Sequence, residues 1–557
     1  DRRQRQMCIR DSLIPFAGWY LPTTYPMTDS LRTRLSAIEP ASLRGITRGL
    51  EKESLRTTAD GKLSMRPHPR ALGSALTHPH ITTDFSESQV ELITGVHDSI
   101  DACLAELTRV HQETLAHIDG ERLWCTSMPC PLPPDRDIPI GQYGSSFIGR
   151  AKTIYRQGLT WRYGSRMQTI SGLHYNFSLP QSLWPELARM PGLKLDGSNP
   201  KHARSQGYFS LIRNFRHHSW LLLLLFGASP LVQRGFAEGM PHILKAFGRD
   251  ALGLPHATTL RMGPLGYQSE AQASIGASYN CLKSYAESLY DALTSPWPAY
   301  EKIGIRHDGQ YRQLSTSLLQ IENEFYGTIR PKQPIRKGER PLAALAARGV
   351  EYIEVRLMDL DPFSAIGITA ETIRFLDIFL LHCLLSDSPR DTPEINAAQS
   401  ANRHTVAQRG REPGLALLEN DGSHRPLLAW GQEVLTECEA VAQRLDEAWP
   451  EHHGAYAAAL RMARQRLEHM EHTPSARLMA DIATQGNGSL TQYTVAQSEA
   501  HRQHLLAQPL PADIREAFAA MARKSFVEQA DIEAADTGDF ETWRQQYITS
   551  VFPLIAD

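Results

Sequence analysis

The sequence predicts an α+β fold, with strands in the earlier part of the chain and helices in the later part. Residues 89–94 and 349–357 alternate polar and apolar side chains, which is the period of a half-buried strand, and residues 46–56 are also predicted to be an extended strand. Beyond about residue 367, apolar residues recur instead at helical spacing. Strands grouped ahead of helices are typical of α+β proteins, in which helices cover a sheet rather than alternate with its strands.

The composition is that of an ordinary globular protein. The 557 residues suffice for two or three domains or one large elaborated domain, and the 41% hydrophobic and 21% charged residues are usual for soluble proteins. A net charge of -3 gives no electrostatic case for a nucleic-acid partner. The longest apolar run, residues 220–226, is far shorter than the ~20 residues that span a bilayer, so we expect a buried core helix and no membrane partner.

The cysteines suggest neither a metal ribbon nor a disulfide framework. There are seven, an odd number, and none forms a Cys-x-x-Cys pair. Cys125 and Cys130 lack an activating partner in the sequence, so we interpret them as structural. A reducing cytoplasm is therefore the predicted location.

The first 26 residues look foreign to the rest of the chain. Residues 1–12 resemble a translated sequencing-library adapter, and the segment has neither the apolar core nor the cleavage site of a signal peptide. We expect residues 1–26 to be a non-native or disordered extension, with the natural protein starting at or near Met27. A disordered natural extension is the alternative.

The remaining elements are predicted in chain order from local pattern. A short helix over 31–43 precedes the strand at 46–56, and Asp60-Gly61-Lys62 is a hairpin turn signal. Further along we expect a helix over 100–118, a strand over 168–180, a helix over 205–226, an irregular insertion over 231–258, a strand over 319–326 and a helix over 373–385.

Side-chain parity assigns polar residues to shared faces of these strands. Glu51 and Glu53 point to one face, about 7 Å apart, and burial would raise their pKa unless a positive group lies between them. A divalent cation is the usual solution, although an exposed strand with both charges in water is the common alternative. The same parity argument groups Gln168, His174 and Asn176, then Gln320, Glu322 and Glu324, then Glu354 and Arg356.

Familiar catalytic motifs are absent, which leaves a distributed set of carboxylates as the candidate site. The sequence has no Gly-x-x-x-x-Gly-Lys-Ser/Thr, Gly-x-Gly-x-x-Gly, His-Glu-x-x-His or Gly-x-Ser-x-Gly. Magnesium takes oxygen ligands and shares them with phosphates, so several carboxylates from different strands would suit two or three ions. Each residue also has a structural alternative: a hydrogen-bonded core histidine, tyrosines that only pack, or an arginine paired along a wet strand.

Several blocks of sequence, in order, resemble the signature blocks of the bacterial monofunctional glutamate–cysteine ligases. This family makes γ-glutamylcysteine in the first step of glutathione synthesis. The matching blocks are 49–56, 81–85, 168–177, 318–326, 329–332 and 353–356. The turn at 145–148, the 231–258 segment and the N-terminal extension depart from the family pattern, and the first two would alter the shape of the substrate pocket.

The resemblance implies a fold and a division of the chain. The family folds as a strongly curved, largely antiparallel sheet, similar to the glutamine synthetase catalytic domain and surrounded by helices. We accordingly expect a catalytic α+β domain over 27–395 and a mainly helical part over 396–557 packed against it.

The resemblance also implies roles for individual residues. Arg356 and Arg156 would be catalytic through contact with phosphate. The implied magnesium ligands are Glu51, Glu53, Asp84, Glu91, His174 and Glu354. The implied substrate-binding residues are Tyr155, Gln168, Asn176, Arg261, Tyr267 and Tyr326.

The implied reaction joins L-glutamate to L-cysteine at the expense of ATP. Two or three Mg²⁺ ions, with Mn²⁺ as a substitute, would help ATP to phosphorylate the γ-carboxylate, and the α-amine of cysteine would then displace phosphate. The expected partners are these small molecules, and a monomer is favoured. The alternatives are a related carboxylate–amine ligase with another amine acceptor, and a non-catalytic sensor that binds magnesium and ATP.

Overall fold

The computed structural model describes residues 28–266, 270–336 and 338–550. The predicted extension over 1–26 and the predicted substrate residue Tyr267 lie outside these ranges.

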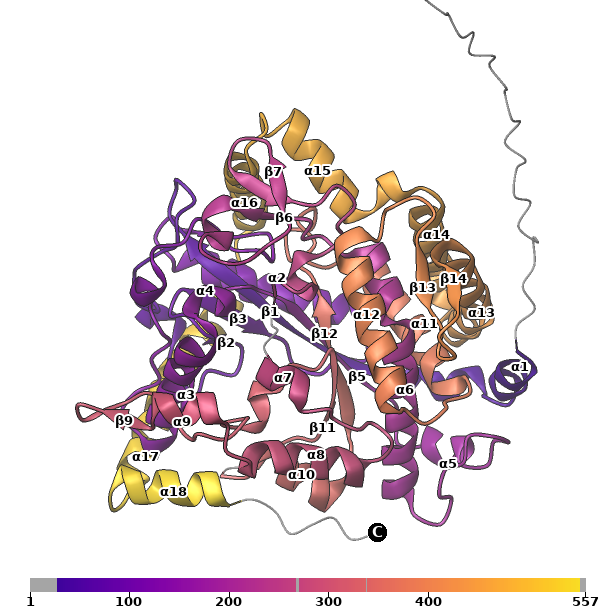
Figure 1. Ribbon diagram of the computed structural model, residues 1–557, viewed down its shortest axis with the longest axis horizontal. Coiled ribbons are helices and arrows are strands. Elements are labelled where there is room, and N and C mark those ends of the chain that lie inside the picture. Colours follow the sequence, from indigo (N-terminus) through magenta and orange to yellow (C-terminus); the bar gives the residue numbers. More distant parts are fainter. Residues whose placement is uncertain (1–27, 267–269, 337, 551–557) are drawn as a thin grey trace, which may run out of the picture.

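An antiparallel sheet forms the centre of the protein, with helices around it (Figure 1). Its strand order is β11-β12-β5-β1-β3-β2, and β4 pairs with the end of β1. Every neighbouring pair is antiparallel, which confirms the α+β prediction with an antiparallel sheet. The strands are β1 (Thr47–Thr57), β2 (Ile81–Thr83), β3 (Gln89–Ile93), β4 (Arg122–Leu123), β5 (Leu173–Ser178), β11 (Ile329–Lys332) and β12 (Tyr352–Met358).

The strong curvature implied by the resemblance is not confirmed, because the sheet is not strongly curled. Bulges are what bend a sheet sharply, and the β12–β5 pairing has one irregularity, between Val355 and Met358. The outer strands β2, β4 and β11 are also only two to four residues long, which leaves little sheet to curl.

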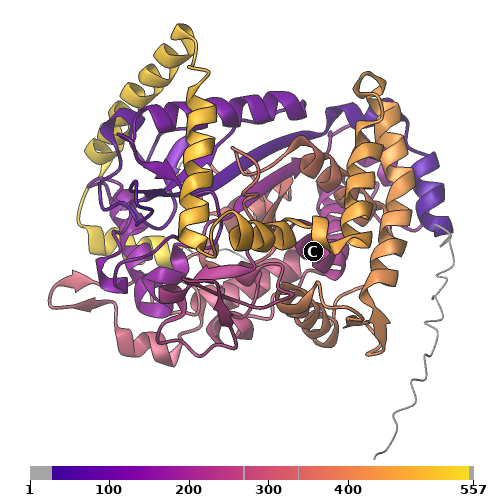
Figure 2. The ribbon, with the colours of Figure 1, turned by 90° about the horizontal axis from the view of Figure 1, so that it is seen from above.

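One face of the sheet is packed against helices, and the other carries the polar residues. Leu50 and Tyr175 are register partners and fully buried. Helix α2 (Ile100–Ala116) lies along this face (Figure 2), where Lys52 of β1 contacts His111 of α2. Because side chains alternate along a strand, Glu51 and Glu53 point to the opposite face.

A buried ion pair ties β1 to the C-terminal helices. Nη2 of Arg48 lies 2.6 Å from Oδ2 of Asp377 on α11 (Ala370–Leu385), and Tyr456 on α14 (Ala455–Glu468) bonds to the same carboxylate at 3.3 Å. All three side chains are buried. Since an unpaired charge in such a place would be very costly, β1 and these helices are held as one unit.

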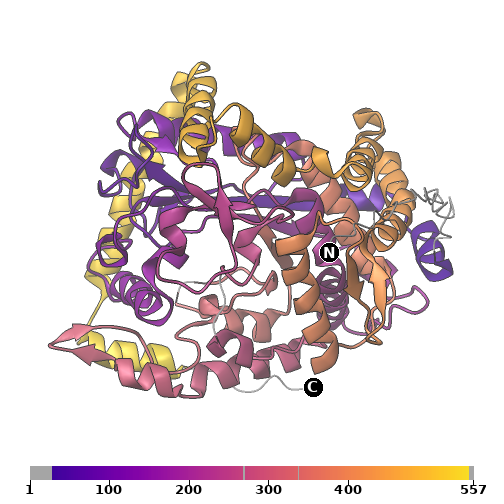
Figure 3. The ribbon, with the colours of Figure 1, turned by 45° about the horizontal axis from the view of Figure 1, so that its top comes forward.

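Helices α6 and α12 form one side of the molecule beside α11. Helix α6 (Pro200–Phe226) contains the apolar run 220–226 as a buried core segment, as predicted. Helix α12 (Pro393–Arg409) packs on α6 (Figures 1 and 3). Among the described residues, no helix is both long and apolar enough to cross a lipid bilayer.

The other helices surround this core. At the C-terminus, α18 packs on α3 and beside the β9–β10 hairpin, where Tyr311 donates to Glu541 at 2.6 Å (Figure 3). The remaining α-helices are α1 (Asp29–Ser36), α3 (Phe147–Tyr163), α4 (Ser165–Gln168), α5 (Leu183–Leu187), α7 (Glu270–Ser274), α8 (Leu282–Thr294), α9 (Pro298–Ile303), α10 (Pro341–Arg348), α13 (Leu427–Ala448), α15 (Pro474–Thr484), α16 (Leu490–Leu506), α17 (Ala512–Ala535) and α18 (Phe540–Thr549). The small hairpins are β9 (Arg306–His307) with β10 (Gln310–Tyr311), and β13 (Ala416–Leu418) with β14 (His424–Pro426).

Two predicted segments have a different structure. The predicted irregular insertion over 231–258 contains a small sheet of β6 (Leu231–Gln233), β7 (Lys245–Phe247) and β8 (Ala251–Gly253). The strand predicted over 319–326 is wrong, since the chain forms a 3-10 helix at Glu322–Glu324.

Buried ion pairs explain why residues 322–324 form a 3-10 helix instead of the predicted strand. Glu322 lies 2.7 Å from Arg340, and Glu324 lies 2.9 Å from Arg162. Both carboxylates are buried and paired with arginines, so these two residues have a structural role rather than facing solvent. Partners from two distant segments therefore fix the local turn, in spite of the alternating pattern.

Candidate active site

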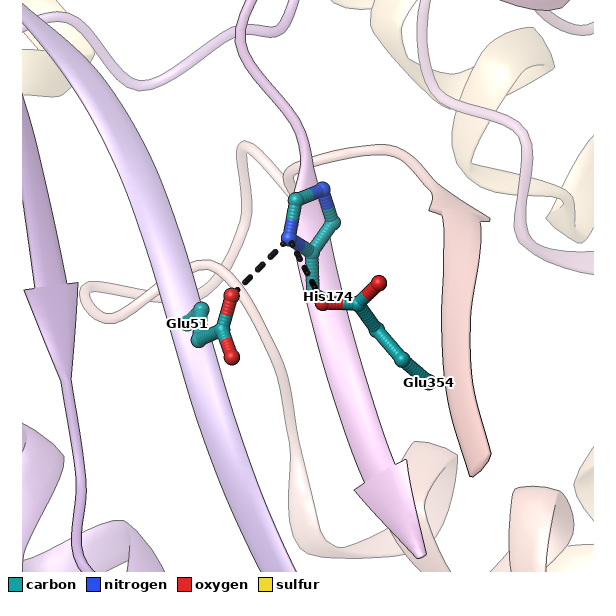
Figure 4. A group of neighbouring side chains, drawn as sticks. All are labelled: Glu51, His174 and Glu354. Atoms are coloured by element: carbon teal, nitrogen blue, oxygen red, sulfur yellow. Dashed lines mark hydrogen bonds and ion pairs between the residues drawn. The ribbon is translucent and has the colours of Figure 1, made fainter. Parts of the chain in front are cut away.

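Three side chains from three adjacent strands meet on the polar face of the sheet (Figure 4). They are Glu51 of β1, His174 of β5 and Glu354 of β12. Nδ1 of His174 lies 3.2 Å from Oε2 of Glu51 and 3.9 Å from Oε1 of Glu354. One ligand atom from each of the three lies within 4.8 Å of the others, which is the spacing of a candidate metal site.

The register of the sheet brings these residues together. Glu51 is the partner of His174, and Glu354 is the partner of Asn176, two positions along β5 on the same face. Side chains that face each other across antiparallel strands have Cβ atoms about 5 Å apart. The cluster is therefore fixed by the backbone pairing rather than by loops.

Two further predicted carboxylates extend the cluster along β1 and β3. Glu53 and Glu91 are register partners. Oε2 of Glu53 accepts the backbone N–H of Gly172 at 2.7 Å, and its Oε1 lies 3.7 Å from Nε2 of His174. Four carboxylates and one imidazole are thus gathered on one face.

The pKa values of this group diverge in a way that signals excess negative charge. Burial, and then Asp84, raises the pKa of Glu53 to about 8. Burial, followed by Glu51 and Asp84, raises the pKa of Glu91 well above its ordinary value. A bound cation would relieve both effects, because it favours the ionised carboxylate.

The other carboxylates already have positive neighbours. Burial alone would raise the pKa of Glu354, but Lys332 at 3.1 Å and Arg356 at 2.9 Å outweigh it and hold the pKa well below its usual range. For Glu51, burial is likewise outweighed by the hydrogen bond with His174, and the pKa is lowered. Burial, with Arg356 next, lowers the pKa of His174, which favours the neutral imidazole that ligates metals.

A cavity opens beside the cluster and is lined by most of the predicted residues. Its lining combines side chains of the sheet and of helices α3 and α4 with residues 261–263, 323, 326–328 and 403–404. The predicted residues in its lining are Glu53, Asp84, Tyr155, Arg156, Gln168, His174, Arg261, Tyr326 and Arg356. Four predicted residues lie outside the lining but on the same face of the sheet as Glu53 and His174: Glu51, Glu91, Asn176 and Glu354.

Three of the predicted arginines reach this cavity with their guanidinium groups held by the protein. Nη1 of Arg356 donates to Oε2 of Glu354 at 2.9 Å. Nη2 of Arg261 donates to the carbonyl of Arg356 at 2.8 Å. Arg156 donates to the carbonyl of Asp84 and lies over the Tyr143 ring, 4.4 Å from its centre.

A glycine makes this arrangement of arginines possible. A Cβ on Gly172 would lie 2.1 Å from Nη2 of Arg261, far closer than van der Waals contact. Only glycine lets the guanidinium approach the start of β5 at this point.

Two of the predicted substrate-binding residues, Gln168 and Tyr326, bond to each other in the lining of the cavity. The Tyr326 hydroxyl donates to Oε1 of Gln168 at 2.9 Å. Gln168 ends helix α4, so the prediction that it lies in a strand with His174 is wrong, although its side chain still faces the same cavity. Asn176 instead donates to Oε1 of Glu51 at 2.9 Å.

The sequence reasoning missed other residues at the site. Lys332, on β11, contacts Glu354, and the only signal for it in the sequence was its place in the 329–332 block that resembles the family. Arg403 and His404, on α12, line the cavity, but no signal in the sequence connects this helix to the acidic strands.

Comparison with known proteins gives the class and the family. A family model described as glutamate-cysteine ligase matches residues 34–406. The glutamate–cysteine ligases of Bordetella petrii and Azotobacter vinelandii are each 47% identical to this chain. The alignments cover 94% of this chain in both cases, and 98% and 99% of the two relatives respectively. The crystal structure of glutamate–cysteine ligase from Francisella tularensis in complex with AMP superposes with a TM-score of 0.84 and 36% identity, over 91% of this chain and 98% of that one.

Fold, site and relatives define this protein as an enzyme of the ligase class. The matches extend over nearly the whole described chain, including the strands that carry the acidic cluster. The chain belongs to the glutamate–cysteine ligase family.

Proposed function

We propose that this protein joins the γ-carboxylate of L-glutamate to the α-amine of L-cysteine, with ATP converted to ADP and phosphate, to give γ-glutamylcysteine. Its family supports the reaction, and the AMP bound to the Francisella tularensis relative supports a nucleotide substrate. The single observation that carries the proposal is the acidic cluster of Glu51, His174 and Glu354 beside an arginine-lined cavity. Such a site suits the transfer of a phosphoryl group between anionic reactants.

The donor set fits magnesium. The predicted ligands are one imidazole and five carboxylates, and hard oxygen donors of this kind suit Mg²⁺, with Mn²⁺ as a substitute. Burial first, and neighbouring carboxylates second, raise the pKa values of Glu53 and Glu91, and a bound cation would lower both. Two or three ions would be held by Glu51, Glu53, Asp84, Glu91, His174 and Glu354. When bound, they would supply charge neutralisation for the phosphoryl group in transfer.

Arg356 and Arg156 would also neutralise the negative charge of the phosphoryl group in transfer. The glutamate γ-carboxylate attacks the terminal phosphorus of ATP, the bond to ADP breaks, and a γ-glutamyl phosphate forms. The cysteine amine then attacks the acyl carbon, the bond to phosphate breaks, and the amine loses a proton. Arg356 and Arg156 line the cavity and would stabilise the three equatorial oxygens during the first step.

The polar wall of the cavity would orient the amino acids. Tyr155, Gln168 and Tyr326 present hydroxyl and amide groups there, and Arg261 a charged one. We propose that these residues hold the substrates and keep water from the acyl phosphate, with Tyr267 as a further contact predicted from the sequence alone. The free thiols of the described cysteines support a location in the reducing cytoplasm as part of the proposal, and a monomer stays a prediction from the sequence.

Phosphate release from ATP tests the proposal directly. The protein is incubated with ATP, Mg²⁺ and L-glutamate, with and without L-cysteine, and the product is identified by mass. We expect release that requires both amino acids and a product with the mass of γ-glutamylcysteine. Release with another amine, but not with cysteine, would indicate a related ligase, and binding of ATP without any turnover would indicate a sensor.

A further inference from the structure

The lining of the cavity includes an arginine for which no function has been proposed so far. Arg403 is on α12, after residues 353–356, the last of the quoted sequence blocks, and within the residues 34–406 that the family model matches. Its side chain lines the same cavity as Arg261 and Arg356, and His404 lies beside it. Because α12 packs on α6 rather than on the sheet, this residue reaches the cavity from a different part of the fold.

Arg403 differs from Arg156, Arg261 and Arg356 because its guanidinium makes no hydrogen bond to the residues that the structure describes. Its Nη1 is buried and has no hydrogen-bond partner within the described residues. Likewise, none of the ion pairs found in the described part of the chain involves Arg403, whereas Arg356 pairs with Glu354 at 2.9 Å. A buried donor without an acceptor is costly, so an arginine left in this state by the protein alone is suited to an external acceptor.

The electrostatic surroundings of Arg403 strengthen this point. The charged neighbour that affects it most is Arg216, which is of the same sign and already lies 3.4 Å from Asp391. Burial, and then Arg216, lowers the pKa of Arg403 to about 10, with Tyr279 opposing. The guanidinium is therefore still charged at neutral pH and lacks an anion.

The position of Arg403 favours a carboxylate over a phosphate. The phosphates of the nucleotide belong at the acidic cluster, where cations would hold them. Among the described residues, no carboxylate of the cluster forms an ion pair with Arg403, whereas Lys332 and Arg356 both pair with Glu354. Each amino-acid substrate reacts at one end and has an α-carboxylate that must be anchored elsewhere, and a guanidinium binds a carboxylate through two parallel hydrogen bonds.

On the basis of the proposed function, we propose that Arg403 is a specificity-determining residue that binds the α-carboxylate of an amino-acid substrate. L-glutamate and L-cysteine both carry an α-carboxylate, and the KM values of the two substrates show which of them Arg403 binds. The KM of one amino acid should depend on Arg403, while the KM of ATP should not.

The test compares Arg403→Gln and Arg403→Lys with Arg409→Gln. Arg409 lies on the same helix but is exposed and paired with Glu412, so it controls for the loss of an arginine from α12. In Arg403→Gln we expect the KM of one amino acid to rise about 10- to 100-fold, with kcat changed less than about threefold. Arg403→Lys should recover part of the affinity, and Arg409→Gln should behave as the wild type.

Substrate analogues that lack the carboxylate identify the partner. Cysteamine replaces cysteine, and 4-aminobutyrate replaces glutamate. The wild type should prefer each amino acid over its analogue, as measured by the ratio of their kcat/KM values. In Arg403→Gln this ratio should fall by the same factor as the KM rises, and only for the amino acid that Arg403 binds. Unchanged KM values for both amino acids, or a rise confined to ATP, would overturn the proposal.

A binding measurement keeps this test independent of turnover. If the wild type shows no cysteine-dependent phosphate release, the proposed reaction is wrong. The role of Arg403 is then tested without turnover, by calorimetric titration with L-glutamate and with L-cysteine. Mg²⁺ and a non-hydrolysable ATP analogue are present in both titrations. Weaker binding of one amino acid to Arg403→Gln supports its role, and equal affinity, or no binding to the wild type, refutes it.

Discussion

The side-chain amide of Asn176 donates a hydrogen bond to Oε1 of Glu51 over 2.9 Å, while Oε2 of the same carboxylate faces His174 at 3.2 Å. The carboxylate of Glu51 is thus held from both sides. Oδ1 of Asn176 is itself buried and has no hydrogen-bond partner in the part of the chain that the structure describes. This geometry makes Asn176 a group that positions Glu51, one of the proposed metal ligands.

Asn176→Leu should therefore weaken magnesium binding. Leucine has the same branched skeleton, although it is larger than asparagine, and it cannot donate to Glu51. The loss of such a supporting hydrogen bond typically costs 10- to 100-fold in metal affinity. We expect the magnesium concentration for half-maximal activity to rise about 10-fold, with the KM of both amino acids unchanged at saturating magnesium. A rise in an amino-acid KM at saturating magnesium would instead support the substrate-binding role predicted from the sequence.

Glu51→Gln should remove most of the activity and leave the fold intact. The amide keeps the volume of the side chain but loses the charge, so the cluster attracts cations less strongly. We expect turnover at limiting magnesium to fall at least 100-fold, with an unchanged circular dichroism spectrum. The matched control is Glu516→Gln, on an exposed glutamate of α17. Retained turnover of Glu51→Gln at limiting magnesium would rule out Glu51 as a ligand.

The sheet and its faces could be predicted because strand geometry is local. A period of two assigns Glu51 and Glu53 to one face of β1, and Glu354 and Arg356 to one face of β12, and the structure has the first pair and Glu354 at the acidic site. What this pattern cannot give is the order of the strands. The adjacency of Glu51, His174 and Glu354 was available only through the resemblance, because it depends on long-range pairing.

The errors arise where distant partners override a local pattern. The segment 319–326 alternates like a strand, but Arg162 and Arg340 draw Glu324 and Glu322 into a buried turn. Arg403 was missed for a related reason, because the packing of α12 on α6 brings it to the cavity and no motif accompanies it. Local periodicity is informative about faces and uninformative about such tertiary contacts.

Gly172→Ala should disable the site through Arg261. The added Cβ would lie 2.1 Å from Nη2 of Arg261, and the backbone at this position needs no left-handed conformation, so the collision is the only obstacle. We expect displacement of the guanidinium, a loss of about 1–3 kcal/mol in the free energy of unfolding and a drop in kcat/KM of at least 10-fold. Chemical unfolding and steady-state kinetics measure the two effects.

Gly235→Ala is the matched control for this substitution. A Cβ at Gly235 meets nothing within 4 Å, so this variant should keep the stability and the activity of the wild type. Wild-type kinetics for Gly172→Ala would show that Arg261 can move aside without consequence, and would remove it from the set of substrate contacts.

Lys52→Met should change how stability depends on pH. Lys52 is buried on the helix-covered face of β1, where its ammonium donates to Nε2 of His111 at 2.9 Å, and burial lowers its pKa from 10.5 to about 8. Between pH 8 and 10.5 the unfolded chain binds a proton at Lys52 that the folded protein does not bind, so the folded state gains stability as pH rises. The gain amounts to about 3 kcal/mol over this range.

Urea unfolding of the wild type and of Lys52→Met between pH 7.5 and 10.5 measures this effect as a difference. We expect the wild type to gain about 3 kcal/mol relative to Lys52→Met as the pH rises, because the substituted chain has no ammonium to discharge. Lys524→Met, at an exposed lysine of α17, controls for the loss of a lysine and should show no such trend. Parallel pH profiles for the wild type and Lys52→Met would mean that Lys52 keeps its ordinary proton affinity, and that water or a rearranged partner reaches it in the folded protein.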